Sequence, residues 1–309
     1  MTYILRKGHS QLTDLKDGGQ AYGHGCYANA YPPPASTTYY VNYGGNDSAS
    51  GLDPAEPLLT ITEAVSKCTN DRHDTIVVMN YWLNEDGPIT INKRHVSVVG
   101  SHSGANWFGG APAAPAIMLN AAGDTQVLIL AERDIAIANF VFDSGASYAA
   151  ITFTGGAGYV RQGIFNCQFT SGKYGIESTA GSSYQPSHYL TIKNCWFHPD
   201  LTSGGILLGS NGSWPLIENC WFEQVPGPQI NVTGAHAGGR ILYNMHSLDS
   251  DTAGEAITLG SNPSRYYVQG NRANDAGITA MTANPFVDGG VDNIWVDNYR
   301  CNAVLLPGG

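Results

Sequence analysis

Hydrophobic and polar residues alternate along short segments that recur through the second half of the chain. In the segment from Ile217 to Phe222, alternation places Ile217, Cys220 and Phe222 inward and Glu218 and Trp221 outward. Each such segment is centred on an asparagine, and these asparagines recur every 25 to 28 residues, at Asn139, Asn166, Asn194, Asn219, Asn244, Asn271 and Asn298. A repeat of this length with short β-rich runs predicts an all-β fold, a single-stranded right-handed parallel β-helix.

The predicted coils stack about 4.8 Å apart, so equivalent residues should form files along the solenoid. Each asparagine is expected at the bend between two strands, because asparagine tolerates left-handed backbone angles. One core file should contain Cys167, Cys195, Cys220 and Met245. Two more should contain phenylalanines and isoleucines, at Phe142, Phe169, Phe197 and Phe222 and at Ile151, Ile176, Ile206, Ile230, Ile257 and Ile278.

Further strands are expected upstream, at residues 75–79, 89–92, 96–100 and 127–141, which gives roughly nine to eleven coils between residue 75 and the C-terminus. A short helix near residues 60–68 should precede them. Thr60 and Glu63 fit a capping box. One apolar stripe of this helix contains Ile61, Ala64, Val65 and Cys68. This stripe would cover the unpaired edge of the first coil.

The segment of residues 40–65 joins a strand (40–41), a Gly/Asn/Asp-rich turn (45–51), Pro57 and the helix that begins near Thr60. This order resembles the opening segment of the pectin-lyase-like right-handed parallel β-helix superfamily. The resemblance implies one solenoid domain, residues 39–309, closed at its start by the capping helix. A short β-helix preceded by a nonperiodic arm is also similar to phage tailspike-like and capsid-decoration proteins.

Residues 1–38 differ from the rest of the chain. They have no sustained strand or helix period, and they contain a Tyr/His/Gly-rich run at 22–31 followed by three prolines at 32–34. We expect an extended N-terminal arm with a stiff proline spacer. The arm could anchor the protein to another protein or pack along its own solenoid. At the other end, residues 303–306 are the expected last strand, whose open edge would dock on a neighbour.

The composition fits a globular β-protein, because 42% of the 309 residues are hydrophobic and only 13% are charged. A net charge of −10 argues against nucleic acid and anionic membranes as partners. No apolar run reaches the length of a membrane span, and no secretion signal opens the chain. The six cysteines form no Cys-x-x-Cys pair, so we expect buried thiols, no metal site and no cofactor, in a protein made in a reducing cytoplasm.

Outward positions near the bends form the candidate binding surface. The residues two places after the bend asparagines include Trp196, Trp221 and His246, and Lys193 and His198 lie beside them. Outward tryptophans among polar residues suit the centre of a subunit interface, a glycan-binding platform or a patch covered by a loop. The spacing alone leaves these three roles open.

The catalytic motifs of the superfamily are incomplete in this chain. A polygalacturonase-like site would need Gly-His-Gly and Arg-x-Lys in the solenoid, but the Gly-His-Gly at residues 23–25 precedes it and no Arg-x-Lys occurs. A lyase-like Trp-Ile-Asp-His strand is approached only at residues 295–298, on the last expected coil. Glu218 and Glu223 are the carboxylates that could act as a glycosidase pair.

These observations favour a noncatalytic virion structural protein. It would be a homotrimeric spike or capsid decoration, anchored to a phage capsid or tail protein through residues 1–38, with a cell-surface polysaccharide as its candidate ligand. Trimerisation and the virion location follow from the resemblance to tailspike-like proteins. The alternative is a polysaccharide lyase or glycoside hydrolase of the β-helix class. A third reading is a glycan-binding module without catalysis that uses Trp196, Trp221 and His246.

Overall fold

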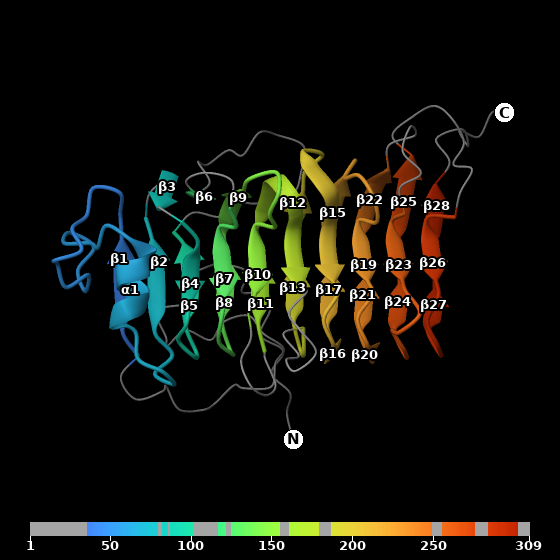
Figure 1. Cartoon of the computed structure of the whole chain (residues 1–309), viewed down its shortest axis with the longest axis horizontal. Helices are drawn as coiled ribbons and strands as arrows, with labels where there is room; N and C mark the ends of the chain where they lie inside the picture. Colours follow the sequence, from blue (N-terminus) through green and yellow to red (C-terminus); the bar gives the residue numbers. More distant parts are fainter. Residues whose placement is uncertain are drawn as a thin grey trace, which may run out of the picture.

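The computed structural model describes residues 36–79, 82–85, 87–101, 117–121, 125–154, 161–178, 187–248, 255–275 and 284–301, and the statements below concern these residues. Most of the predicted arm, residues 1–38, lies outside them, as do Ile278 and the expected last strand at 303–306. The described chain is an elongated stack of β-strands with one short helix near its start (Figure 1).

The strands form three parallel sheets that run along the stack. Sheet A has ten strands in the order β1 (Thr38–Val41), β2 (Thr75–Val78), β5 (Ser97–Gly100), β8 (Ala136–Ala138), β11 (Gly163–Phe165), β13 (Thr191–Lys193), β17 (Leu216–Glu218), β21 (Arg240–Leu242), β24 (Tyr267–Gln269) and β27 (Ile294–Val296). The sixteen-stranded sheet has two parts, which we call sheets B and C and which join at β12 (Gln168–Ser178).

Sheet B contains β3 (Trp82–Glu85), β6 (Ile117–Ala121), β9 (Phe140–Asp143), the start of β12, β14 (Trp196–Phe197), β18 (Trp221–Glu223), β22 (Met245–Leu248), β25 (Arg272–Asp275) and β28 (Tyr299–Cys301). Sheet C contains β4 (Ile89–Ile91), β7 (Leu128–Leu130), β10 (Ile151–Phe153), the end of β12, β15 (Leu201–Leu208), β19 (Ile230–Val232), β23 (Ile257–Leu259) and β26 (Phe286–Asp288). A two-stranded sheet pairs β16 (Gly212–Ser213) with β20 (His236–Ala237).

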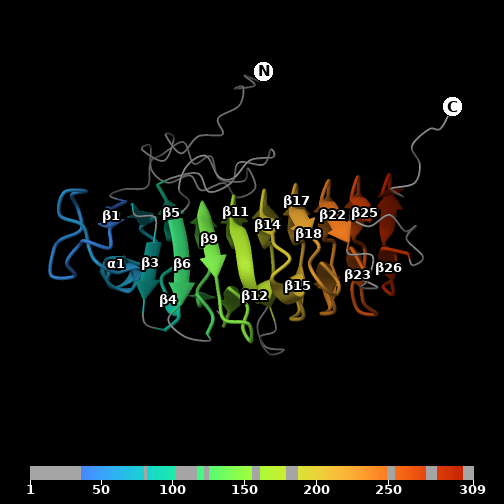
Figure 2. The ribbon, with the colours of Figure 1, turned by 90° about the horizontal axis from the view of Figure 1, so that it is seen from above.

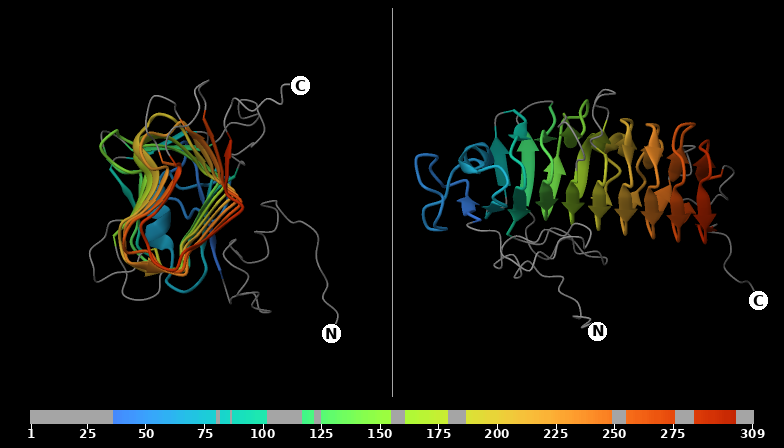
Figure 3. Two further views of the ribbon diagram at one scale, coloured as in Figure 1. Left: turned by 90° about the vertical axis from the view of Figure 1, so that its right-hand side faces the viewer. Right: turned by 90° about the horizontal axis from the view of Figure 1, so that it is seen from below.

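The prediction of an all-β parallel β-helix is confirmed. Successive coils contribute one segment to each sheet in turn, so their strands superimpose when the stack is viewed from its end (Figure 3). Nine of the ten strands of sheet A begin at Thr75 or later, in agreement with the nine to eleven coils expected.

The helix α1 (Ile61–Lys67) caps the first coil as predicted. Its apolar stripe is buried, with exposed fractions of 3% or less at Ile61, Ala64, Val65 and Cys68. Half of the predicted capping box forms, because the Glu63 amide donates to Thr60 Oγ1 at 3.0 Å. The reciprocal bond is made by Asp47, whose Oδ1 accepts from the Thr60 amide at 2.9 Å, and the Glu63 carboxylate instead pairs with Lys67 at 3.1 Å.

A buried carboxylate from β3 fastens this helix to the stack. Glu85 accepts hydrogen bonds from the amides of Ile61 and Thr62 and from the Thr62 hydroxyl, the last at 2.6 Å. Burial raises the pKa of Glu85, and these hydrogen bonds oppose the rise by favouring the ionised form. The free amides at the start of α1 therefore find their partner on another coil.

The predicted core files are present. Successive phenylalanine rings stack with centroids 5.3 Å apart for Phe142 and Phe169, 4.8 Å for Phe169 and Phe197, and 4.6 Å for Phe197 and Phe222. Cys167, Cys195 and Cys220 are fully buried free thiols, as expected. The isoleucine file runs from Ile151 to Ile257, and its next member in the register is Phe286.

The asparagine ladder shifts by one residue between Asn219 and Asn244, which the sequence period did not reveal. The first four asparagines, Asn139, Asn166, Asn194 and Asn219, occupy the left-handed bend as predicted, with φ between 53° and 66°. On the next three coils the bend residue is Tyr243, Gly270 or Asp297, with φ of 55°, 68° and 50°. The prediction that Asn244, Asn271 and Asn298 form the bend is therefore wrong.

The three later asparagines instead point inward and continue the cysteine file. Asn244 Oδ1 accepts a hydrogen bond from the Cys220 amide at 2.8 Å. Asn244 Nδ2 donates to Asn271 Oδ1 at 2.9 Å, and Asn271 Nδ2 donates to Asn298 Oδ1 at 2.8 Å. Each buried amide is thus satisfied by its neighbour, as a polar group in a core must be. Met245, predicted for this file, lies outside the core and is 44% exposed.

The same shift turns His246 inward, which corrects its predicted outward position. His246 pairs with Phe222 in the register and is 1% exposed. Its ring extends the phenylalanine file, 4.9 Å from the Phe222 centroid and nearly parallel to it. Nδ1 lies 2.9 Å from Gln229 Oε1. Burial lowers the pKa of His246 from 6.5 to about 3, because a charged imidazolium loses its hydration there.

The lowered pKa of His246 predicts that the protein loses stability in acid. His246 binds a proton more readily in the unfolded chain, so its contribution to stability is complete above pH 6.5 and falls as the pH drops from 6.5 toward 3. When the pH falls from 7.5 to 5, the wild type should lose about 2 kcal/mol more of its unfolding free energy than the His246→Phe variant. Urea denaturation at both pH values measures this. Phe222→Leu, which disturbs the same file without removing a titratable group, should keep the wild-type pH dependence; an unchanged pH dependence in His246→Phe would contradict the assignment.

Candidate functional site

The predicted tryptophan surface forms on the outer face of sheet B. Trp196 and Trp221 lie on adjacent strands, with ring centroids 4.8 Å apart and planes within 8° of parallel. His198 also stacks on Trp196, at 4.3 Å, and the Trp196 indole Nε1 donates to Glu223 Oε2 at 3.1 Å. Burial lowers the pKa of His198. Because Trp196 is stacked on two neighbours, little of its ring face is free to receive a ligand.

Lys193 and Glu218, the other predicted members, lie around the bend on sheet A. The Lys193 ammonium and the Glu218 carboxylate form an ion pair at 2.6 Å. Glu218 and Glu223 thus belong to different sheets on either side of Asn219, and each already has a partner. A glycosidase pair must face the same sugar bond. The structure brings Trp196, Trp221, His198 and Glu223 together, leaves Lys193 and Glu218 as a separate pair, and places His246 in the core.

A second row of side chains follows the edge that leads into sheet A. We call it the leading corner, and it consists of the residue two places before each strand of that sheet from β2 onward. Its members are His73, His95, Asp134, Arg161, Tyr189, Trp214, Gly238, Arg265 and Asp292. Most of them have the left-handed backbone conformation, which turns the chain at this edge.

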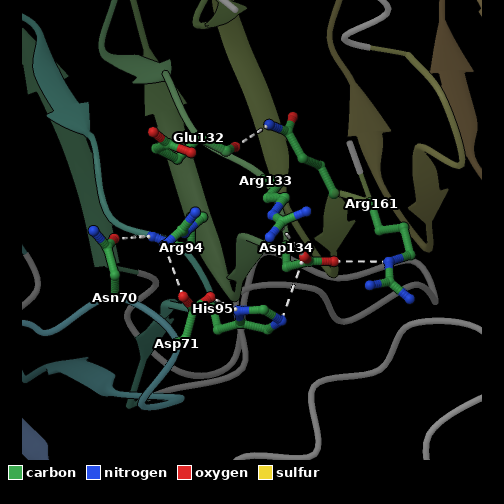
Figure 4. A network of polar contacts seen from close by, with 9 residues as sticks. Asn70, Asp71, Arg94, His95, Glu132, Arg133, Asp134 and Arg161 are labelled. Carbon is green, nitrogen blue, oxygen red and sulfur yellow. Dashed lines mark hydrogen bonds and ion pairs between the residues drawn. The ribbon is translucent and has the colours of Figure 1, made fainter. Parts of the chain in front are cut away.

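The first part of the leading corner is a network of paired charges, drawn in Figure 4. His95 lies between two carboxylates, with Nδ1 2.9 Å from Asp71 and Nε2 3.3 Å from Asp134. Arg94 pairs with Asp71 at 2.7 Å, and Arg161 pairs with Asp134 at 2.8 Å. Loss of hydration raises the pKa of Asp71, but the hydrogen bond from His95 and the charge of Arg94 outweigh this effect and hold that pKa below its usual value. These pairs tie four successive coils together at their corners.

The middle of the leading corner is aromatic and exposed. The rings of Tyr189 and Trp214 stack at 5.1 Å, and their exposed fractions are 38% and 50%. The buried ring of His188 packs edge-on against both, at 4.5 Å and 5.5 Å. The next corner residue is Gly238, where a Cβ atom would lie 2.5 Å from Trp214 Nε1. The Gly238 main chain therefore packs against the indole on that side, and a larger corner residue would not fit there.

This aromatic pair is held in an unfavourable conformation. Tyr189 and Trp214 have φ values of 55° and 54°, where a bulky residue costs on the order of 1–3 kcal/mol. Their exposure means that burial of the rings returns only part of that cost. Most other residues of the leading corner share these left-handed angles, so what distinguishes the pair is that both of its residues are aromatic and exposed.

Sequence reasoning missed the aromatic pair, although a signal was present. Asp134, Arg161, Tyr189 and Trp214 each stand five residues before a bend asparagine, so they share a register position. Gly238, Arg265 and Asp292 instead stand six residues before Asn244, Asn271 and Asn298. This is the same one-residue shift that moves Asn244 into the core.

Neither a metal site nor a membrane helix is found in the part of the chain that the structure describes. No group of three or more His, Cys, Asp or Glu side chains is arranged there to hold a metal ion. The described residues include no helix that is long and apolar enough to cross a membrane.

Comparisons with known proteins give a distant structural likeness. No family model matches the chain, and no curated protein matches it. Four solved chains match, and they include the native GH136 lacto-N-biosidase from Eubacterium ramulus. That structure is 12% identical with a TM-score of 0.38, over 86% of this chain and 68% of the other. Such a likeness carries no argument about what this chain binds or catalyses, and the expected similarity to phage tailspike-like proteins stays a prediction.

The contact between Trp214 and Gly238 can be tested directly. Gly238→Ala should lower the free energy of unfolding by about 1–3 kcal/mol, because the residue has a φ of 73° and the new methyl group meets the indole. Acrylamide quenching of tryptophan emission should change as Trp214 is displaced. Gly260→Ala is the matched control, since the nearest atom to the added Cβ would be at 3.4 Å and the φ of Gly260 lies outside the left-handed region. Equal effects of the two substitutions would contradict this account of the corner.

Proposed function

We propose that this protein is a noncatalytic β-helix that binds a glycan at the Tyr189–Trp214 pair. The observation that carries the proposal is the stack of two aromatic rings in left-handed backbone positions, 38% and 50% exposed. The C–H face of a pyranose ring is apolar and packs on aromatic rings, while its hydroxyl groups stay in water. An exposed tryptophan and tyrosine side by side suit such a ligand.

The contacts of the candidate carboxylates support a role without catalysis. Glu218 is held by Lys193, and Glu223 accepts from the Trp196 indole. A general acid needs a raised pKa and a free approach to the leaving group. The Lys193 ammonium occupies the Glu218 carboxylate and obstructs its approach to a leaving group.

The enzyme reading is a second candidate because of one contact. The hydrogen bond from Trp196 Nε1 orients the Glu223 carboxylate beside an aromatic surface, an arrangement that a polysaccharide lyase or glycoside hydrolase could use. Release of reducing ends or unsaturated products from polysaccharides would support this reading. If activity exists and survives both Glu218→Gln and Glu223→Gln, these residues are not its catalytic groups.

A virion role for this glycan-binding solenoid is also part of the proposal. A solenoid that binds a cell-surface polysaccharide would serve as a spike or capsid decoration, with residues 1–38 as the attachment to a capsid or tail protein. The glycan surface proposed here lies on the described solenoid and is separate in sequence from residues 1–38. Immunogold labelling of phage particles with an antibody against the solenoid tests this location.

The glycan proposal is tested by binding. We expect the full chain to bind members of an array of neutral oligosaccharides and polysaccharides, and titration of the positives should show at least a tenfold loss of affinity in Trp214→Ala, because the sugar loses its stacking surface. Tyr243→Ala is the matched control: Tyr243 is 50% exposed and also left-handed, but it stands alone at the opposite corner. No binding by the wild type, or equal losses in both variants, would refute the proposal.

A further inference from the structure

An exposed stripe runs along the outer face of sheet B. The register places Trp196, Trp221, Met245, Arg272 and Tyr299 in one outward file, strand after strand along β14, β18, β22, β25 and β28. Figure 2 shows β14, β18, β22 and β25 following one another along the stack. Met245 is 44% exposed, Tyr299 is 52% exposed, and Arg272 is exposed. We call this file the sheet B stripe.

The composition of the sheet B stripe is that of an interface. Tryptophan, tyrosine, methionine and arginine are the residues enriched at the centres of protein contacts. Within the described residues, the Arg272 side chain forms no ion pair or hydrogen bond, and its neighbours along the file are Met245 and Tyr299. An exposed thioether, a guanidinium with no partner among the described residues and an exposed phenol lie in one row, on a surface that a partner could cover.

The order of residues along the stripe is self-complementary. Coils are spaced about 4.8 Å apart, so the stripe has Met245 at its centre, with Trp221 and Arg272 one coil away on opposite sides. A two-fold axis that runs along the strands at the Met245 coil reverses the stack and keeps the strand positions. It sets Met245 against its copy, Arg272 against the partner's Trp221, and Tyr299 against the partner's Trp196. Such a contact is isologous, because each pairing occurs twice.

Charge decides between this arrangement and a parallel one. With the stacks reversed, the Arg272 guanidinium of one copy faces the Trp221 ring and comes within reach of Glu223, which lies two residues farther along β18. With the stacks parallel and in register, as around a three-fold axis along the stripe, Arg272 would meet Arg272. Like charges brought together oppose association.

We propose that two copies of this chain pair antiparallel through the sheet B stripe, with Arg272 of each copy bound against Trp221 and Glu223 of the other. The contact uses the face that follows the Asn219 bend, whereas the Tyr189–Trp214 pair lies at the corner before sheet A. The dimer therefore leaves the leading corner free, and its test is independent of glycan binding.

Sedimentation velocity of the full chain tests the proposal. We expect a dimer for the wild type, a monomer for Arg272→Glu and a monomer for Glu223→Arg, each judged folded by its thermal transition. The double variant Arg272→Glu with Glu223→Arg should recover the dimer, because the swapped charges again face each other. Within one chain these two residues are two coils, about 9.6 Å, apart, so a recovery reports contact between copies. Arg240→Glu, on the outer face of sheet A, is the control for the charge change and should remain dimeric.

A second measurement covers the case in which a charged variant misfolds. Met245→Cys, made in a chain that also carries Cys26→Ser and Cys301→Ser, should form a disulfide-linked dimer under mild oxidation, since the two-fold axis brings position 245 next to its copy. The other four cysteines are buried free thiols. A monomeric wild type, a trimer, a dimer that survives Arg272→Glu, or a Met245→Cys variant that does not crosslink would overturn the proposal.

Discussion

Parallel backbone pairing between coils about 4.8 Å apart is the constraint on which the rest of the structure depends. It places each side chain over its counterpart in the next coil, so chemically similar groups pack on one another. Phe169 stacks on Phe197 in the core, and Trp196 stacks on Trp221 outside, both at 4.8 Å. The interior is therefore a set of files rather than a single packed centre, and stability is shared between neighbouring coils.

A one-residue change in the position of the asparagine relative to the bend alters both faces, because side chains in a strand alternate between inside and outside. After Asn219 the bend moves to Tyr243, the core receives Asn244 and His246, and the surface receives Met245. The amide file of Asn244, Asn271 and Asn298 makes the change tolerable, since each buried amide bonds to the next. The protein keeps its pairing register and changes its chemistry.

Period-two alternation and a constant repeat were enough to predict the architecture, the capping helix and the phenylalanine file. They did not locate the shift, because Asn219 and Asn244 are as far apart as Asn194 and Asn219. Asn219 forms its bend, whereas Asn244 directly follows the bend at Tyr243 and lies in the core. The prediction of the candidate site is wrong at His246 for the same reason. A bend at Asn244, two residues before His246, would place that side chain on the outer face. Tyr189 and Trp214 were missed because a corner residue has no alternation of its own.

The buried thiols give the molecule an internal gauge of local opening. Only a thiolate reacts readily with alkylating reagents. Burial raises the pKa of Cys195, in the middle coils, and raises that of Cys68, at the C-terminal end of α1, to about 12. Each thiol is therefore silent until its own part of the stack opens. The labelling rate at Cys68 reports when the capping helix detaches, and the labelling rate at Cys195 reports when the central coils separate. A solenoid that frays from one end would reveal in this way which end gives first.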